Sequence, residues 1–164
     1  MKHFHSLLTV TAAALLIGAA QLRAEDRLTK AADNKVYAQA LVNEVIQAHP
    51  DLIIVGFHAV APGAKNETMI ASTLDRIGEK DDDEDLAVVS QQETILAVSL
   101  KEPYKFKVHL PMKDASGKVI GLMVLIFKNE AGRDETYYCA KALAIRNGVA
   151  QRIPNLDALF KQAP

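Results

Sequence analysis

The apolar positions along the first part of the chain follow two different repeats. Between residues 31 and 49 they recur at spacings of three and four, which is typical of a helix with one buried side. Pro50 ends this helix because proline cannot continue the hydrogen-bond ladder. The next residues, 52–57, form a short run that is almost wholly apolar and rich in β-branched side chains. This run predicts a buried strand.

The middle of the chain has weaker patterns. Residues 66–72 show no clear repeat and fit either a short strand or a helical turn. A brief helix is expected over 74–78, where two apolar residues three positions apart precede a glycine. It would end before the acidic run at 81–85. Two short apolar runs then predict strands, at 86–89 and at 94–98.

The clearest pattern is a hairpin in the second half of the chain. Between 105 and 110, lysine and histidine alternate with apolar residues, which predicts a strand with one solvated and one buried face. Residues 114–117 are typical of a tight turn in which glycine supplies a positive φ. The returning run, 119–127, is apolar on both faces and predicts a covered central strand. A helix over 134–149 and a short terminal helix over 156–160 complete the pattern.

These elements together indicate the fold class. Strands joined by a hairpin, with helices towards the ends of the chain, are typical of α+β proteins. We therefore predict a central antiparallel β-sheet flanked by a long N-terminal helix and a C-terminal helix. No internal repeat or low-complexity segment divides the chain. The part of the chain that follows residue 24 has about 140 residues, which is the usual length of one domain.

The first 24 residues have the composition of a secretory signal peptide. A basic start precedes an apolar stretch at 7–20, which is too short to span a bilayer. Small residues allow cleavage after Ala20 or after Ala24, and Ala24 is preferred because a charged segment surrounds it. The prediction is a signal peptide at 1–24, one domain at 25–164 and a periplasmic or secreted location. An uncleaved anchoring helix is the alternative.

Composition narrows the expected partners. Removing the leader changes the formal net charge from -1 to -3, and no basic cluster is present that would neutralise phosphates. No nucleic-acid partner is therefore expected. Cys139 is the only cysteine, so the chain cannot form an internal disulfide and its fold must rest on its core. No further apolar stretch is long enough for stable membrane insertion after signal cleavage.

One segment resembles a known family. Residues 110–121, LPMKDASGKVIG, resemble the L-P-L-x-D-x-x-G-x-x-I-G hairpin of PAS-like and Cache-like extracytoplasmic sensor domains, and the order of elements is similar as well. The resemblance implies a PAS/Cache-like, profilin-like fold with a pocket for a small ligand. Such sensors usually carry a transmembrane helix and a cytoplasmic output domain. Because neither pattern is found in this sequence, we expect the ligand-binding module standing alone.

Four polar residues are candidates for ligand binding. His58 follows the first apolar strand, where a rigid strand presents side chains to an adaptable loop; a structural histidine is the alternative. Lys107 and His109 would bind an anionic group if their strand face lines the pocket, and an ordinary solvated face is the alternative. Asn66 lies in the irregular middle segment and also begins a glycosylation acceptor pattern.

The acidic run at 81–85 is the strongest charge feature. Five adjacent carboxylates repel one another unless a cation or cationic side chains offset them, but the run lacks the spaced oxygens and the glycine of an EF-hand loop. A solvated loop is the preferred interpretation, and no metal ligand is predicted. Catalytic-serine, zinc and phosphate-loop signatures are absent from the sequence. No catalytic residue is therefore assigned, and the cofactor stays unknown.

Three functional hypotheses follow. The leading one is an exported module of PAS/Cache-like type, sensory or accessory, that binds a small molecule between the sheet and the irregular middle segment. The second is a small periplasmic enzyme or metal-dependent hydrolase using His58, His109 and the acidic run, which requires these groups to converge within a few ångströms. Histidines on opposite faces of the sheet would exclude it. The third is an accessory protein that docks on a protein partner through the N-terminal helix or an open sheet edge.

Overall fold

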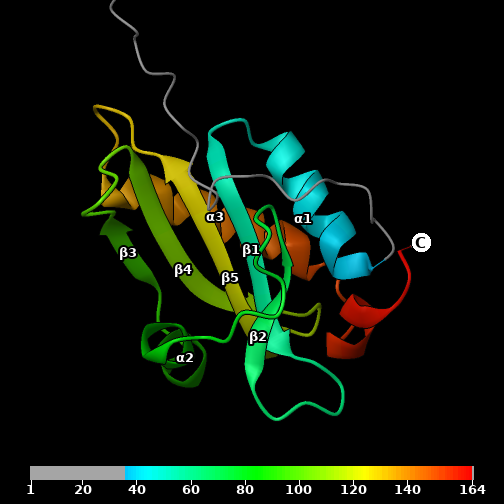
Figure 1. Ribbon diagram of the computed structural model, residues 1–164. Coiled ribbons are helices and arrows are strands. Elements are labelled where there is room, and N and C mark those ends of the chain that lie inside the picture. The colour runs from blue at the N-terminus through cyan, green and yellow to red at the C-terminus, as the bar shows by residue number, and fades with distance from the viewer. Residues whose placement is uncertain (1–35, 164) are drawn as a thin grey trace, which may run out of the picture.

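The computed structural model describes residues 36–163 (Figure 1). The elements are α1 (Tyr37–Ala48), β1 (Leu52–Val60), β2 (Glu67–Ser72), α2 (Asp83–Gln91), β3 (Ile95–Val98), β4 (Lys105–Lys113), β5 (Val119–Lys128), α3 (Glu135–Ala150) and the 3-10 helix η3 (Leu156–Phe160). The predicted signal peptide at 1–24, its two cleavage points and the first residues of the helix predicted from 31 lie outside the described residues. Within the described part, no helix is both long enough and apolar enough to span a membrane.

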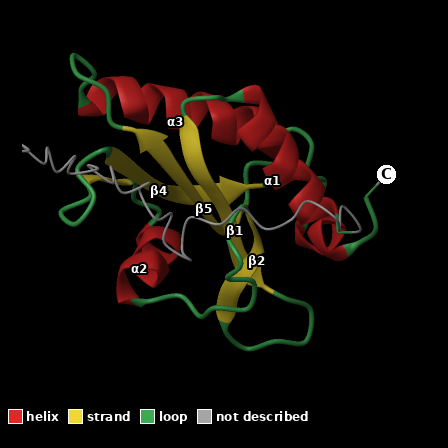
Figure 2. Cartoon of the chain, turned by 45° about the horizontal axis from the view of Figure 1, so that its top comes forward, coloured by secondary structure: helices red, strands yellow, loops and turns green. Residues whose placement is uncertain are grey.

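The five strands form one antiparallel sheet in the order β2-β1-β5-β4-β3. The strand β5 lies in the centre, as expected for a run that is apolar on both faces. Figure 2 shows α1 and α3 against one face of the sheet and α2 against the other. The prediction of an α+β fold with an antiparallel sheet flanked by an N-terminal and a C-terminal helix is confirmed. The ambiguous segment at 66–72 contains the strand β2.

The larger core lies between the sheet and the helices α1 and α3. Alternate residues of β1, β4 and β5 face this side and meet the apolar side of each helix. Tyr138 anchors α3, because its ring stacks on Phe106 with 4.2 Å between centroids. Its hydroxyl donates to the backbone carbonyl of Lys128 at 3.0 Å, so this buried polar group is satisfied. The core therefore fixes both helices on the same face of the sheet.

The other face is covered by α2, where a strand had been expected over 86–89. The carboxylate of Asp82 caps this helix by accepting from the backbone N–H of Asp85 at 3.0 Å. Three acidic residues in the first turn favour a helix as well, because they lie at the positive end of the helix dipole. Val88 is fully buried against side chains of β5. The strand prediction at 86–89 is wrong because these capping signals outweigh the short apolar run.

The brief helix expected over 74–78 is also wrong. The chain instead runs back beside β2, where the backbone N–H of Gly78 donates to Met69 at 2.8 Å and the N–H of Met69 donates to Glu79 at 2.9 Å. Gly78 has a φ of 92°, which lets the chain turn at this point. This pairing partly covers the outer edge of β2 and directs the acidic run towards the face of the sheet on which α2 packs.

The predicted hairpin is confirmed as β4 and β5. The carboxylate of Asp114 accepts from the backbone N–H of Lys118 at 3.1 Å, and Gly117 has a φ of 85° in the turn between them. Gly121 is needed for a different reason. A Cβ atom at this position would lie 2.0 Å from the backbone carbonyl oxygen of His58 on β1. Only glycine therefore allows β1 and β5 to approach this closely.

We expect Gly121→Ala to lower the free energy of unfolding by about 1–3 kcal/mol or more, because the added carbon meets backbone that cannot rotate away. Gly148→Ala is the control. An added Cβ at Gly148, on α3, meets no atom within 4 Å, so this change should raise stability by about 0.5–1 kcal/mol. Urea denaturation checks both values. A Gly121→Ala variant as stable as the unsubstituted protein would show that the two strands separate at little cost.

Candidate functional site

The candidate site lies on the face of the sheet that α2 covers. Residues of β1, β2, β4 and β5, together with residues between 74 and 85, line a cavity of about 300 Å³. His58 of β1 and both Lys107 and His109 of β4 are among its lining residues. The face of β4 that was expected to be solvated is therefore largely covered, and His109 is only 8% exposed.

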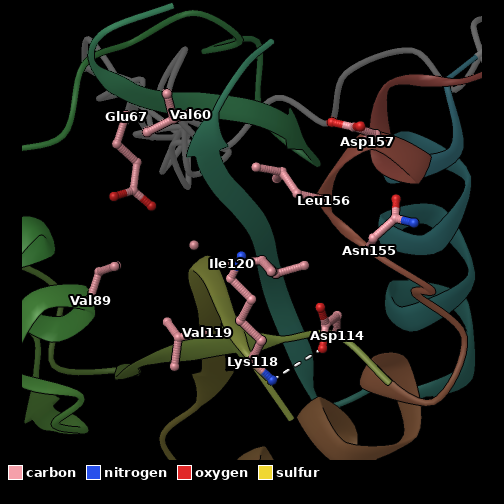
Figure 3. A pocket seen from close by; sticks show the side chains of 11 residues that line it. Val60, Glu67, Val89, Asp114, Lys118, Val119, Ile120, Asn155, Leu156 and Asp157 are labelled. Carbon is pink, nitrogen blue, oxygen red and sulfur yellow. Dashed lines mark hydrogen bonds between the residues drawn. The ribbon is translucent and has the colours of Figure 1, made fainter. Parts of the chain in front are cut away.

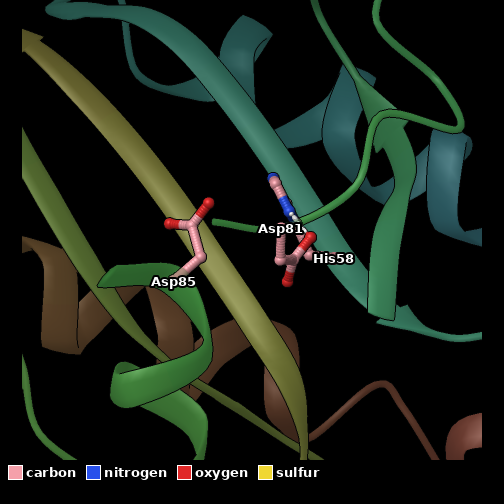
Figure 4. Close-up of side chains that lie close together, drawn as sticks. All are labelled: His58, Asp81 and Asp85. Atoms are coloured by element: carbon pink, nitrogen blue, oxygen red, sulfur yellow. Dashed lines mark hydrogen bonds and ion pairs between the residues drawn. The ribbon is translucent and has the colours of Figure 1, made fainter. Parts of the chain in front are cut away.

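His58 forms a buried pair with Asp81. His58 lies opposite Met69 of β2, and Met69 is bonded to Glu79 beyond the strand edge, so Asp81 comes within reach two residues later. The distance from His58 Nδ1 to Asp81 Oδ1 is 2.7 Å (Figure 4). The two side chains are 6% and 1% exposed. A carboxylate this deeply buried requires a hydrogen-bonding or cationic partner, and His58 supplies one.

A second pair lies on the same face. Asp85, in the first turn of α2, has its Oδ1 3.0 Å from Nδ1 of His109. Burial by itself would raise the pKa of Asp85, but the hydrogen bond of His109 and the cationic groups nearby outweigh it and hold this pKa below its ordinary value. The strand β5 separates His58 from His109, so their backbones are at least about 10 Å apart. Both histidines lie on one face of the sheet, so the opposite-face placement that would exclude the hydrolase hypothesis does not occur.

Three buried polar atoms of this region have no hydrogen-bond partner in the described part of the chain: His58 Nε2, Asp81 Oδ2 and Glu67 Oε1. A buried polar group without a partner costs about 1–3 kcal/mol. Folded proteins contain few such groups, so three in one place call for an explanation. The side chains of the site therefore do not supply a hydrogen-bond partner for each of its buried polar atoms. This is typical of a site that binds a ligand or an ion.

Glu67, at the start of β2, adjoins the buried pair and is 9% exposed. Burial, and after it the neighbouring carboxylate of Asp81, raises the pKa of Glu67 to about 7. A hydrogen bond with the backbone of Leu122 opposes this shift. Glu67 also lines a larger cavity of about 460 Å³ beside the β4–β5 turn and η3 (Figure 3). Glu67 thus lines that cavity and also interacts electrostatically with Asp81.

The 300 Å³ cavity has an apolar part and a charged part. The apolar lining residues come mainly from the strands and are Ile54, Met69, Leu74, Val124 and Ile126. The charged lining residues carry both signs and are Arg76, Glu79, Lys80, Asp82, Asp85 and Lys107. The side chain of Lys107 is 35% exposed, and its Nζ is 3.9 Å from Glu84 Oε1. An exposed pair of this kind is weak, so Lys107 is free to bind an anionic ligand.

The structure brings together three of the four predicted binding residues. His58, Lys107 and His109 line the same cavity. Asn66 does not, because it is exposed in the loop before β2 and lies outside the lining of that cavity. The expectation of a solvated loop at 81–85 is wrong for its two ends. The first and last carboxylates of the run contact histidines, and only the three between them are exposed.

Glu67 was missed from the sequence, and Asp81 and Asp85 were considered only as part of the acidic run in the hydrolase hypothesis. For Asp81 and Asp85 a signal was present, since an acidic run directly before an apolar stretch is typical of a helix start. A helix at that place would have positioned its first turn over the sheet. For Glu67 the sequence holds no signal, because its burial results from the pairing of β2 with β1.

The raised pKa of Glu67 predicts a pH-dependent contribution to stability. The pKa of Glu67 is about 7 in the folded chain against an ordinary value of 4.5, so between these values the folded state holds a proton that the unfolded state has released. Stability is therefore expected to fall as the pH rises from about 4.5 to about 7, by up to about 1.4 kcal/mol per pH unit, and then to level off.

Glu67→Gln isolates this contribution, because glutamine resembles the protonated carboxyl at every pH. Urea denaturation across the range from about pH 5 to about pH 8 should show the variant gaining stability relative to the unsubstituted protein up to about pH 7. Glu93→Gln, at an exposed position, is the control and should show no such trend. A Glu67→Gln difference that is constant over the whole range contradicts the raised pKa.

Comparison with known proteins reveals a likeness of fold. No family model and no curated protein matches the chain. The GAF domain of a two-component sensor histidine kinase from Bacillus halodurans is similar over 72% of this chain and 94% of its own, with a TM-score of 0.52 and 14% identity. The inducer-binding domain of the PobR transcription factor from Acinetobacter, crystallised with 3-hydroxybenzoic acid, covers 73% of this chain and 97% of its own, with a TM-score of 0.46 and 13% identity. The likeness to the sensor-kinase domain shows that the described chain has a GAF-like α+β fold, of the PAS-like class that the hairpin at 110–121 implied.

Proposed function

We propose that this chain is a small-molecule-binding module of PAS/Cache-like type that acts outside the cytoplasm. The observation that carries the proposal is the cavity beside the first turn of α2, where His58, Lys107 and His109 lie around an apolar wall. A concave site with a few convergent polar groups and a shifted pKa nearby is the usual location of a ligand in a small domain. The GAF-like fold, found also in a domain of a sensor kinase, supports the same conclusion.

The cavity favours a small ligand with an apolar body and one anionic group. A volume of about 300 Å³ is at the lower end for ligand cavities, which suits a metabolite better than a large cofactor. The apolar body would contact Val124 and Ile126 on β5. The anionic group would lie near Lys107, whose ammonium group can form a charge-assisted hydrogen bond with it. His109, held in place by Asp85, would complete the polar end of the cavity.

We also propose that the module is exported. The support is the pattern of residues 1–24, in which a basic start, a short apolar stretch and small residues at the cleavage points follow one another. A periplasmic or secreted module that binds a metabolite would serve in a sensory or accessory role.

Thermal unfolding with a panel of small organic acids tests ligand binding. An acid present at 100 times its dissociation constant should stabilise the fold by about 2.7 kcal/mol. In Gly56→Val this effect should be lost. Gly56 lines the cavity, and a Cβ there meets its nearest neighbours at 3.6–3.7 Å without a clash, so the methyl groups of valine would occupy space that the ligand needs.

Thr68→Val is the matched control for this test. Thr68 lies on β2 opposite Ala59, which is buried in the larger core on the other face of the sheet. This variant should respond to the acid as the unsubstituted protein does. Equal stabilisation of Gly56→Val would place the ligand elsewhere. A panel in which no compound raises the melting temperature contradicts the proposed function.

Export has a separate test. When the full sequence is expressed in a bacterial host, the protein recovered from the periplasm should begin at Glu25, or at Gln21 if cleavage follows Ala20. Intact-mass spectrometry distinguishes these two products from the uncleaved chain. Recovery of only the full-length mass in the membrane fraction would favour an anchoring helix over a signal peptide.

A further inference from the structure

We propose that His58, Asp81 and Asp85 bind a divalent transition-metal ion of the zinc or manganese class. One candidate ligand atom from each residue lies within 4.8 Å of those of the other two. Figure 4 shows the three side chains approaching one another from β1, from the segment before α2 and from α2 itself. Ligands on opposite sides of a bound ion are about 4–5 Å apart, twice the metal–ligand distance. The three residues therefore need only small movements to coordinate one ion.

Buried atoms without partners distinguish this place from an ordinary cluster of charges. The side chains of His58 and Asp81 are 6% and 1% exposed. Their mutual hydrogen bond uses one polar atom of each, whereas His58 Nε2 and Asp81 Oδ2 have no hydrogen-bond partner within residues 36–163. Burial of a carboxylate is tolerated when a cation or several hydrogen bonds compensate for the lost water. A metal ion would supply that compensation to both carboxylates at once.

The donor atoms indicate the class of ion. One imidazole nitrogen with two carboxylate oxygens suits zinc, manganese or iron-group ions, whereas magnesium and calcium prefer oxygen ligands alone. Two carboxylates also neutralise the charge of a divalent ion. The ring of His109, 3.0 Å from Asp85, would orient that carboxylate, as residues behind metal ligands commonly do.

The cavity beside the three proposed ligands is lined by cationic as well as acidic side chains. The Nζ of Lys107 is 3.9 Å from a carboxylate oxygen of the exposed Glu84, so Lys107 pairs with a residue outside the three proposed ligands. The proposed ion would lie at the polar end of the ligand cavity, because His58 and Asp85 line that cavity too. Metal binding does not require the organic ligand, so the two proposals fail or succeed separately.

Calorimetric titration of the chelator-treated full chain with Zn²⁺ or Mn²⁺ alone tests the site. We expect one ion per chain and a higher melting temperature when the ion is bound. Asp81→Asn and Asp85→Asn keep the size of the side chain and should weaken binding at least about 100-fold, because changes behind the ligands already cost roughly 10- to 100-fold. Asp83→Asn is the matched control, since Asp83 belongs to the same acidic run but is exposed, and its affinity should be unchanged.

Two further variants keep the test decisive if an asparagine variant does not fold. His58→Gln removes a ligand and should abolish tight binding, and His109→Gln should weaken it about tenfold because it acts only through Asp85. Far-ultraviolet circular dichroism checks the fold of each variant. The proposal is overturned if the unsubstituted protein shows no saturable binding of either ion. It is also overturned if every folded variant binds as tightly as Asp83→Asn, in which case the two histidine pairs are structural contacts only.

Discussion

The burial of β5 on both faces is the constraint on which the rest of the structure depends. Because residues 119–128 are apolar almost throughout, helices on one side of the sheet cannot shield them from water. The helices α1 and α3 cover one face, and α2 covers the other through Val88. The helix α2 begins with an acidic turn. Its packing on an apolar strand therefore brings carboxylates onto the sheet.

The buried carboxylates then determine what else that face must contain. Asp81 and Asp85 each contact a histidine, one from β1 and one from β4, the two strands that flank β5. These contacts replace part of the hydration that the carboxylates lose. They also form the polar end of the cavity. The same side chains thus allow α2 to pack and provide the groups that the proposed ligand or ion would contact.

Predictability from the sequence differed between the ends of the chain and its middle. The hairpin of β4 and β5 has strict alternation on one strand and a glycine turn, so its two strands, its turn and the central place of β5 could be predicted. The run at 86–89 is short and apolar, and such a run fits a strand or a buried helix equally well. Its acidic start favours the helix, but only packing on β5 makes that helix stable. His58, Lys107 and His109 could be selected as candidates because they interrupt or border apolar strands.

Local signals in the sequence determined the fold class, the two outer helices, the central hairpin and three of the residues that line the cavity. Only the tertiary structure decided that Asp81 reaches His58, that Glu67 is buried and that Asn66, its neighbour in the chain, is exposed. These outcomes depend on the pairing of β2 with β1 and on the backbone bonds between Met69 and the residues Gly78 and Glu79. Contacts between distant segments form because they bury the apolar surface of the whole sheet. The free energy of that burial depends on all the strands together, so no local pattern of residues predicts it.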